Sequence, residues 1–190
     1  GGLRARASSA LIEDNVLSFN VADAQGGGAK LSHAANEFVG NLVEGNVAGE
    51  EGGGVELDND ATHVADCTFL DNSADHGGGL HSVDTVGELL IESSTFQGNT
   101  ATHCGGGICI EDEPYEVTLT HIDASANLAA WGGGICLRWA EVAVRNSVVF
   151  GNTATSGGGG LYVEDVEGWL LQTVAAGNDS PAGSGIYLTQ

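Results

Sequence analysis

Basic residues are scarce in this sequence: 5 Lys and Arg stand against 26 Asp and Glu in 190 residues, which gives a net charge of −21. A chain of that charge repels phosphates, and this excludes a nucleic-acid partner. Only 2 prolines accompany 31 glycines, so the glycines do not belong to a collagen helix. No apolar run approaches the roughly 18 residues of a membrane-spanning helix. Aromatic residues are few, at 6%, but 42% hydrophobic residues suffice for a core and exclude a disordered acidic tail.

Glycine triplets recur along the whole chain, and an apolar residue follows almost every one. They begin at Gly26, Gly52, Gly77, Gly105, Gly132 and Gly158, with a GSG variant at Gly183. An asparagine lies five or six residues before each triplet, at Asn20, Asn46, Asn72, Asn99, Asn127, Asn152 and Asn178. Two markers that keep the same period indicate an internal repeat of about 26 residues.

Each repeat contains three short segments that read as strands. Apolar and variable residues alternate after each triplet, as in residues 108–110, and again before the asparagine, as in residues 142–144. A third segment has one inward residue three positions before the asparagine, such as Phe69 or Phe96. The sequence therefore predicts an all-β fold, a right-handed parallel β-helix of about seven coils with three short strands per coil. Stacking such coils about 4.8 Å apart pairs the strands and aligns equivalent residues in columns, including an asparagine ladder.

The ends of the chain lack an obvious cap. We expect residues 1–190 to form a single β-helix domain, in which residues 1–16 are a cap or a partial coil. The first residues show no initiator methionine and no signal-like stretch, so we expect a segment of a longer solenoid or surface protein. Because an uncapped strand edge pairs readily with another chain, either more coils follow or copies associate end to end.

The two markers together resemble a known repeat. Residues 69–72 and 96–99 read FxxN, and each lies shortly before a Gly-Gly-small-apolar motif. This pattern resembles the GGA-[ILV]/FxxN repeats of chlamydial polymorphic outer membrane proteins and related bacterial β-helix surface proteins, although GGG replaces GGA here. The resemblance implies a secreted, cell-surface or outer-membrane passenger that is structural or adhesive, with a protein or glycan as partner.

Columns are where chemistry would lie. We expect the positions four residues after each triplet begins to face outward; from the second coil on they are Lys30, Glu56, His81, Cys109, Cys136, Tyr162 and Tyr187. Cys109 and Cys136 occupy adjacent coils, which places them within reach of a disulfide in an oxidising compartment. Two stacked thiols are the alternative. The position of Tyr162 over Tyr187 has two interpretations, a simple aromatic stack and a platform that binds sugar rings.

Acidic residues gather in the turn after this strand. They are Asp58, Asp60, Asp84, Glu111, Asp112, Glu113, Glu164 and Asp165. Arg138 falls in the same row, between Glu111 and Glu164, where it would relieve their repulsion. The set has two interpretations, a calcium site and a solvated acidic face, and it lacks the DxDxDG loop of an EF-hand. Apart from calcium, no cofactor is expected.

Histidines offer a second candidate cluster. His76 and His103 each follow the repeat asparagine by four residues, so they should stack in adjacent coils, with Cys104 beside them and Trp131 one coil further on. A transition-metal site and a stacked surface pair are both consistent with this spacing.

Enzyme functions find little support in the pattern. β-Helix lyases that act on acidic polysaccharides use basic residues to bind uronates, and this chain has five in all. Hydrolases of this fold need converging carboxylates, and the sequence has no clustered Asp trio beside a Gly-His-Gly. For Ser-His-Asp chemistry, no GxSxG motif is present. We therefore predict a non-catalytic structural or adhesive rod. The alternatives are a fragment of a pectin-lyase-like enzyme and a calcium-dependent surface-layer or matrix module.

Overall fold

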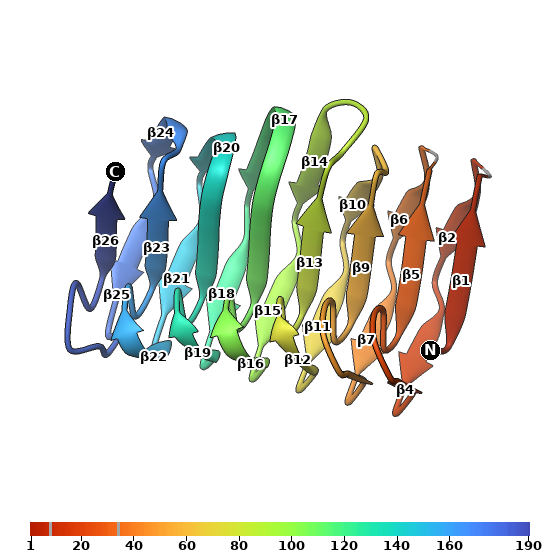
Figure 1. Cartoon of the computed structure of the whole chain (residues 1–190), viewed down its shortest axis with the longest axis horizontal. Coiled ribbons are helices and arrows are strands. Elements are labelled where there is room, and N and C mark those ends of the chain that lie inside the picture. Colours follow the sequence, from red (N-terminus) through yellow and green to blue (C-terminus); the bar gives the residue numbers. More distant parts are fainter. Residues whose placement is uncertain (8, 34) are drawn as a thin grey trace.

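The computed structural model describes residues 1–7, 9–33 and 35–190 as one stack of parallel β-coils (Figure 1). Every strand pairs with its equivalents in the neighbouring coils, in parallel. The predicted parallel β-helix of about seven coils is therefore confirmed, with three sheets running along the stack. The described residues contain no helix, and so none that is long and apolar enough to cross a membrane.

The largest sheet has 13 strands and is crossed twice by most coils. The strands that follow the glycine triplets are β1 (Leu3–Arg6), β5 (Ala29–Ser32), β9 (Val55–Asp58), β13 (Leu80–Val83), β17 (Ile108–Thr120), β20 (Ile135–Arg145), β23 (Leu161–Glu164) and β26 (Ile186–Thr189). The second crossing is made by β2 (Leu11–Glu13), β6 (Glu37–Val39), β10 (His63–Ala65), β14 (Leu89–Glu92) and β24 (Glu167–Leu171). In β17 and β20 the two crossings are fused into one long strand, which pairs with both sets.

Two smaller sheets complete each coil. The seven-stranded sheet contains β3 (Val16–Ser18), β7 (Leu42–Glu44), β11 (Thr68–Leu70), β15 (Thr95–Gln97), β18 (Asp123–Ser125), β21 (Val148–Phe150) and β25 (Val174–Ala176). The six-stranded sheet contains β4 (Val21–Ala22), β8 (Val47–Ala48), β12 (Ser73–His76), β16 (Thr100–Cys104), β19 (Leu128–Trp131) and β22 (Thr153–Gly157). Residues 1–16, expected as a cap or partial coil, carry β1 and β2 in register with the second coil.

Inward residues of the three sheets form one continuous apolar core. The FxxN positions lie in it as expected: Phe69 and Phe96 are fully buried, and their rings stack at 4.4 Å between centroids. Leu31, Leu57 and Ile110 extend the core along the first sheet with no exposed surface. A single coil cannot bury such residues alone, so the core exists only through stacking.

Each coil turns at corners where one residue has a positive φ. The residue before every ladder asparagine is one of these, for example Asp71 (φ 53°) or Gly98 (φ 68°). The first glycine of each triplet is another, as at Gly77 (φ 59°). The following glycines allow close approach: a Cβ on Gly79 would lie 2.5 Å from the carbonyl oxygen of Gly107 in the next coil. Glycine at this corner is therefore a requirement of coil spacing.

The asparagine ladder is hydrogen-bonded throughout. The Asn99 side-chain amide donates to Asn127 Oδ1 (3.1 Å) and to the Phe69 carbonyl (3.0 Å). Its Oδ1 accepts from the backbone N–H and the side-chain amide of Asn72, both at 3.0 Å. All four hydrogen-bonding positions of the buried amide are thus filled, and the pattern repeats along the ladder.

Replacing Asn99 with Ala should lower the free energy of unfolding by at least about 2 kcal/mol, because several buried donors and acceptors lose their partners together. Urea unfolding followed by circular dichroism measures the change. The half-buried Asn20 donates its side-chain amide to Asn46 at the edge of the ladder, so Asn20→Ala should cost clearly less. Equal losses in the two variants would contradict the ladder's role.

Candidate functional site

Two columns of side chains face each other across the glycine triplets. We call the first the strand column; its members pair in register from coil to coil, and they are Arg4, Lys30, Glu56, His81, Cys109, Cys136, Tyr162 and Tyr187. The second, the turn column, contains the residue just before each triplet: Gln25, Glu51, His76, Cys104, Trp131 and Gly157. The turn brings residues five apart in sequence face to face.

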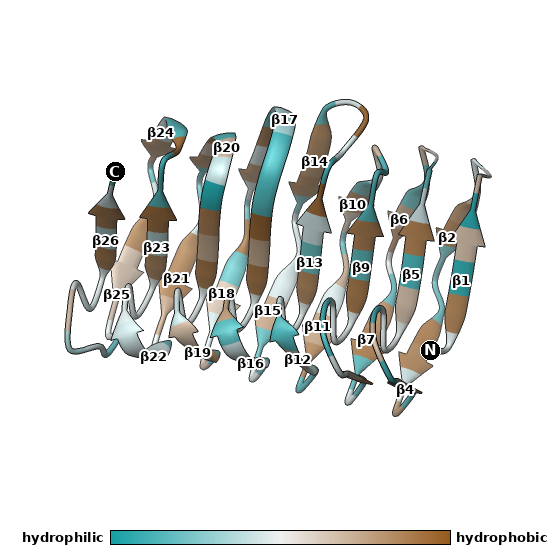
Figure 2. Ribbon diagram, viewed as in Figure 1, coloured by the Kyte–Doolittle hydropathy of each residue, from teal (hydrophilic) through white to brown (hydrophobic). Residues whose placement is uncertain are grey.

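The strand column lies outside the apolar core, but its central members are buried, and for them the prediction of an outward-facing position was wrong. Glu56 and Cys109 have no exposed surface, and His81 is 1% exposed. The reason is the corner before each triplet, which folds the turn column back over the strand column. Figure 2 shows the column as a hydrophilic stripe across β1, β5 and β9 that becomes hydrophobic on β20.

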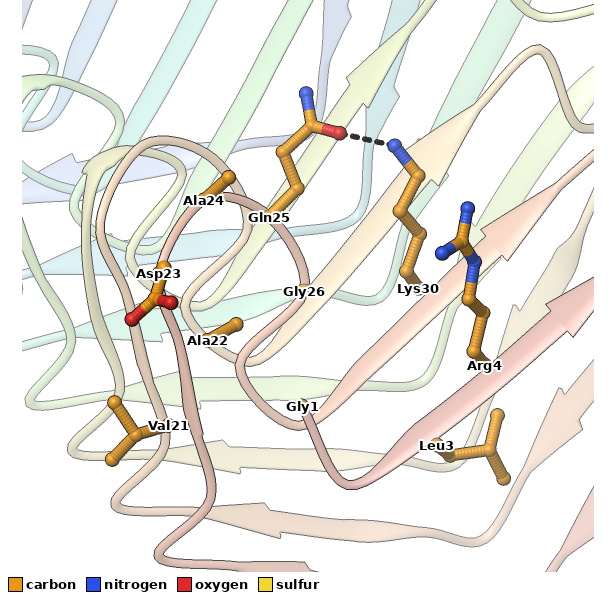
Figure 3. Close-up of a pocket in the computed structure, with 10 residues that line it drawn as sticks. All are labelled: Gly1, Leu3, Arg4, Val21, Ala22, Asp23, Ala24, Gln25, Gly26 and Lys30. Carbon is orange, nitrogen blue, oxygen red and sulfur yellow. Dashed lines mark hydrogen bonds between the residues drawn. The ribbon is translucent and has the colours of Figure 1, made fainter.

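The first coils hold the polar end of the columns. Figure 3 shows Lys30 and Gln25 meeting across the first triplet, with Arg4 beside Lys30 and all three lining a pocket. Lys30 Nζ also lies 2.8 Å from an oxygen of Asp58, and the Gln25 amide donates to Glu51 in the next coil. Lys30 is therefore held by polar neighbours on more than one side.

Ionisable side chains meet at the centre of the columns. His81 Nδ1 lies 2.9 Å from Glu56 Oε2, and its other ring nitrogen lies 3.5 Å from Glu111 Oε2. The same Glu111 oxygen lies 3.6 Å from His76 Nδ1. His76, Glu111 and Cys109 have potential ligand atoms within 4.8 Å of one another. We call His76, His81, Cys109 and Glu111 the central cluster.

Contacts within the central cluster shift its titration. Contact with the Cys109 sulfur and with Glu111 raises the pKa of His76 to about 10, against the opposing effect of burial. Burial alone would lower the pKa of His81, but the charge of Glu56 and contacts with Cys109 and Glu111 raise it well above its ordinary value. The two histidines hold the pKa of Glu111 far below its usual range despite burial. In this cluster the two imidazoles therefore favour their protonated form, and Glu111 favours its ionised form.

The disulfide joins different partners from those expected. Cys109 and Cys136 do stack in register, but the disulfide links Cys136 to Cys104, with 5.8 Å between their Cα atoms. Cys109 remains a free thiol, and the three sulfur atoms lie within 4.8 Å of one another. The sequence prediction missed Cys104 because this residue lies in the turn column. The disulfide runs from there to the strand column of the next coil, a contact that the repeat spacing does not reveal.

The predicted histidine pair forms, but not as a metal site with Cys104. His76 and His103 stack with 5.3 Å between ring centroids. His103 is exposed, and Cys104 is in the disulfide. The structure brings His76 together with His81 and Cys109 instead. The sequence does place His76 and His81 five residues apart on either side of the triplet, and this spacing could have predicted their contact.

The expected acidic ladder is divided among different environments. Asp58 pairs in register with Val83, so Asp84 lies one position beyond the row. Asp84, Asp112 and Asp165 occupy positive-φ corners. Asp60 and Glu113 are buried acceptors: Asp60 accepts from Asn36 and Thr62, and Glu113 accepts from Ser82 and from the Thr85 N–H. Of the eight predicted calcium ligands, Glu111 alone joins a group of three close potential ligands among the described residues.

Basic groups lie between carboxylates of neighbouring coils. Arg138 occupies the row of Glu111 and Glu164, as the sequence predicted, and donates to both, at 3.0 and 2.7 Å. His63 lies in the same way between Glu37 (2.8 Å) and Glu92 (2.9 Å). Burial opposes a charge on His63, but the hydrogen bonds to both carboxylates raise its pKa.

Aromatic rings close the columns in the last coils. Tyr162 and Tyr187 stack as predicted, with 5.7 Å between centroids and an angle of 10° between the ring planes. Trp131 in the turn column packs against Tyr162 at 4.9 Å and is 38% exposed. The columns thus change from charged side chains in the first coils to aromatic rings in the last.

The disulfide predicts a specific outcome of mass spectrometry. A non-reducing digest should give a Cys104–Cys136 crosslink, and a thiol reagent added to the unfolded protein should label Cys67 and Cys109. Cys104→Ser should lower the free energy of unfolding by about 3–4 kcal/mol, because the bond closes a long loop. Cys67→Ser is the control with little effect, since Ser94 and Ser147 occupy the equivalent place in other coils. A Cys109–Cys136 crosslink would contradict this assignment.

His63 predicts a pH-dependent stability. Its folded-state pKa is raised, so its contribution is complete below the ordinary value of about 6.5 and is lost as pH rises through the folded value. The unfolding free energy of the wild type should exceed that of His63→Gln by up to about 1 kcal/mol at low pH, and the difference should vanish at alkaline pH. Urea unfolding across the pH range measures it, with His103→Gln as the exposed control. A difference that grows with pH would refute the assignment.

Family comparison identifies the repeat in two segments. Residues 93–111 and 146–164 match the family model of the Chlamydia polymorphic membrane protein (Chlamydia_PMP) repeat. Both segments run from a corner through the asparagine motif, which reads FQGN in the first and VFGN in the second, and through a glycine triplet into the next strand; they lie two coils apart. No curated protein and no solved structure matches the chain.

The repeat match and the solenoid fold agree with each other. Together they support a structural module of a surface protein, which is outer-membrane or surface-exposed. The resemblance seen in the sequence is confirmed: the chain is a parallel β-helix, and two of its segments match the repeat model of the Chlamydia polymorphic membrane protein family.

Proposed function

We propose that this chain is a stiff, non-catalytic segment of a secreted or cell-surface protein, which supports or displays a binding face for a protein or glycan. The observation that carries the proposal is the uniformity of the coils. In the seven-stranded sheet the strands pair in the same register from one coil to the next, and the buried ladder amides are fully hydrogen-bonded. Such a stack resists bending, because each coil is fixed to its neighbours along every sheet.

The side of the rod provides the candidate binding face. The exposed Trp131 and the half-buried Tyr187, with the buried Tyr162 packed against both, form an aromatic surface of the kind on which sugar rings stack. The excess of acidic residues elsewhere disfavours acidic polymers as partners. A neutral glycan or a protein surface is therefore the ligand class we propose for this face.

Deleting one whole coil tests the structural role. Removal of residues 73–99 joins Asn72 directly to Thr100. Asn72 then takes the place of Asn99, its equivalent in the ladder, so every column stays in phase. The variant should fold into a shorter rod that melts cooperatively, measured by circular dichroism and small-angle X-ray scattering. Removal of residues 73–85 alone shifts the phase by half a coil and should abolish folding.

Two further outcomes bear on the non-catalytic and adhesive parts of the proposal. Release of reducing ends or unsaturated products from polygalacturonate or a neutral glycan by the intact chain would overturn the non-catalytic assignment. Binding on a glycan array that Trp131→Ala abolishes and Trp169→Ala retains would support the aromatic face, since Trp169 is also exposed but lies in the other crossing of the large sheet. Loss in both variants, or in neither, would contradict it.

A further inference from the structure

The central cluster holds donor atoms that the hydrogen bonds of the protein leave unused. His81 has a side chain that is 2% exposed, yet its Nε2 has no hydrogen-bond partner. His76 Nδ1 is likewise buried without one. Both nitrogens point to the same Glu111 oxygen from 3.5 and 3.6 Å, which is beyond good hydrogen-bond distance. Buried polar atoms are normally satisfied, so this arrangement calls for an additional partner.

The two distances from His76 Nδ1 and His81 Nε2 to the Glu111 oxygen match an edge of a metal coordination shell. In a tetrahedral zinc site with bonds of about 2.1 Å, neighbouring nitrogen and oxygen ligands are about 3.4 Å apart. The two nitrogen-to-oxygen distances are close to this value. The Cys109 sulfur lies within 4.8 Å of His76 and Glu111 and completes a set of imidazole, thiol and carboxylate donors. Zinc takes this mixture of ligands readily.

A second feature is typical of histidines that bind metal. His81 is held through Nδ1 by the fully buried Glu56 at 2.9 Å, which directs Nε2 toward Cys109 and Glu111. A carboxylate that orients a ligating imidazole through its other nitrogen is the usual support of zinc sites. This contact places Glu56 as a positioning residue and leaves His81 Nε2 free for a metal.

We propose that His76 Nδ1, His81 Nε2, the Cys109 thiolate and Glu111 bind one divalent transition-metal ion, with zinc the preferred ion. One thiolate and one carboxylate balance the two positive charges. Both imidazoles bind the metal in their neutral form, so metal binding releases any protons they carry. Partial exposure of His76 and Glu111 gives the ion a route from the surface. The inference does not depend on the proposed surface role.

Cobalt binding to the disulfide-bonded protein tests the proposal, because tetrahedral Co²⁺ has intense visible bands and a sulfur-to-cobalt charge-transfer band. One equivalent of Co²⁺, added to metal-free protein without reductant, should produce both signals, and Zn²⁺ should displace it. Cys109→Ser should lose the charge-transfer band, and Glu111→Gln should weaken binding. Glu56→Gln should keep that band while lowering affinity about 10- to 100-fold, as expected for a positioning residue.

Controls separate this site from other sources of metal binding. His103→Gln removes a histidine that stacks on His76 outside the cluster, and Cys67→Ser removes the other free thiol; both should bind as the wild type does. Circular dichroism must show that each variant is folded. Weak octahedral bands alone would indicate loose binding to surface carboxylates and would overturn the proposal. So would binding that requires reduction of the Cys104–Cys136 disulfide, or a charge-transfer band that survives in Cys109→Ser.

Discussion

Glycine backbones of successive coils lie in hydrogen-bonded contact, and this contact governs how the coils stack. The Gly54 N–H donates to the Gly78 carbonyl at 3.0 Å, and the Gly79 N–H donates to the Gly106 carbonyl at 3.1 Å. A side chain would not fit here, since a Cβ on Gly53 would lie 2.4 Å from the Ser73 carbonyl oxygen. This contact sets the coil spacing and the register, and every column follows from it.

The fixed register between coils gives buried polar groups hydrogen-bond partners, so their burial does not destabilise the fold. Each ladder asparagine supplies the partners that its neighbours need, so a row of buried amides is stabilising as a set. The same rule governs charge. Stacked carboxylates would repel one another, and Arg138 and His63 each separate a pair of them. A few basic side chains thus neutralise selected points of a strongly acidic chain.

The triplet corner also creates an interior that the apolar core does not occupy. Because the turn column folds over the strand column, Glu56, His81 and Cys109 are enclosed in a second compartment beside the core. There the low exposure strengthens electrostatic interactions and shifts the titration of both histidines. A fold built by simple repetition can therefore hold a unique cluster, since each coil contributes a different side chain to the same position.

Recurring residues were enough to predict the period, the parallel β-helix, the asparagine ladder, the inward FxxN position and the place of Arg138 between Glu111 and Glu164. These follow from residues that recur at the same position, so stacking alone brings them together. The folded coil was needed to show that the centre of the strand column is buried, that Cys104 and not Cys109 pairs with Cys136, and that His76 meets His81. Those contacts cross the triplet corner, and their geometry depends on the left-handed backbone of its first glycine and on how far the turn folds back. Repetition in a sequence records which residues lie above one another, whereas the path of the chain within one coil decides which of them lie face to face.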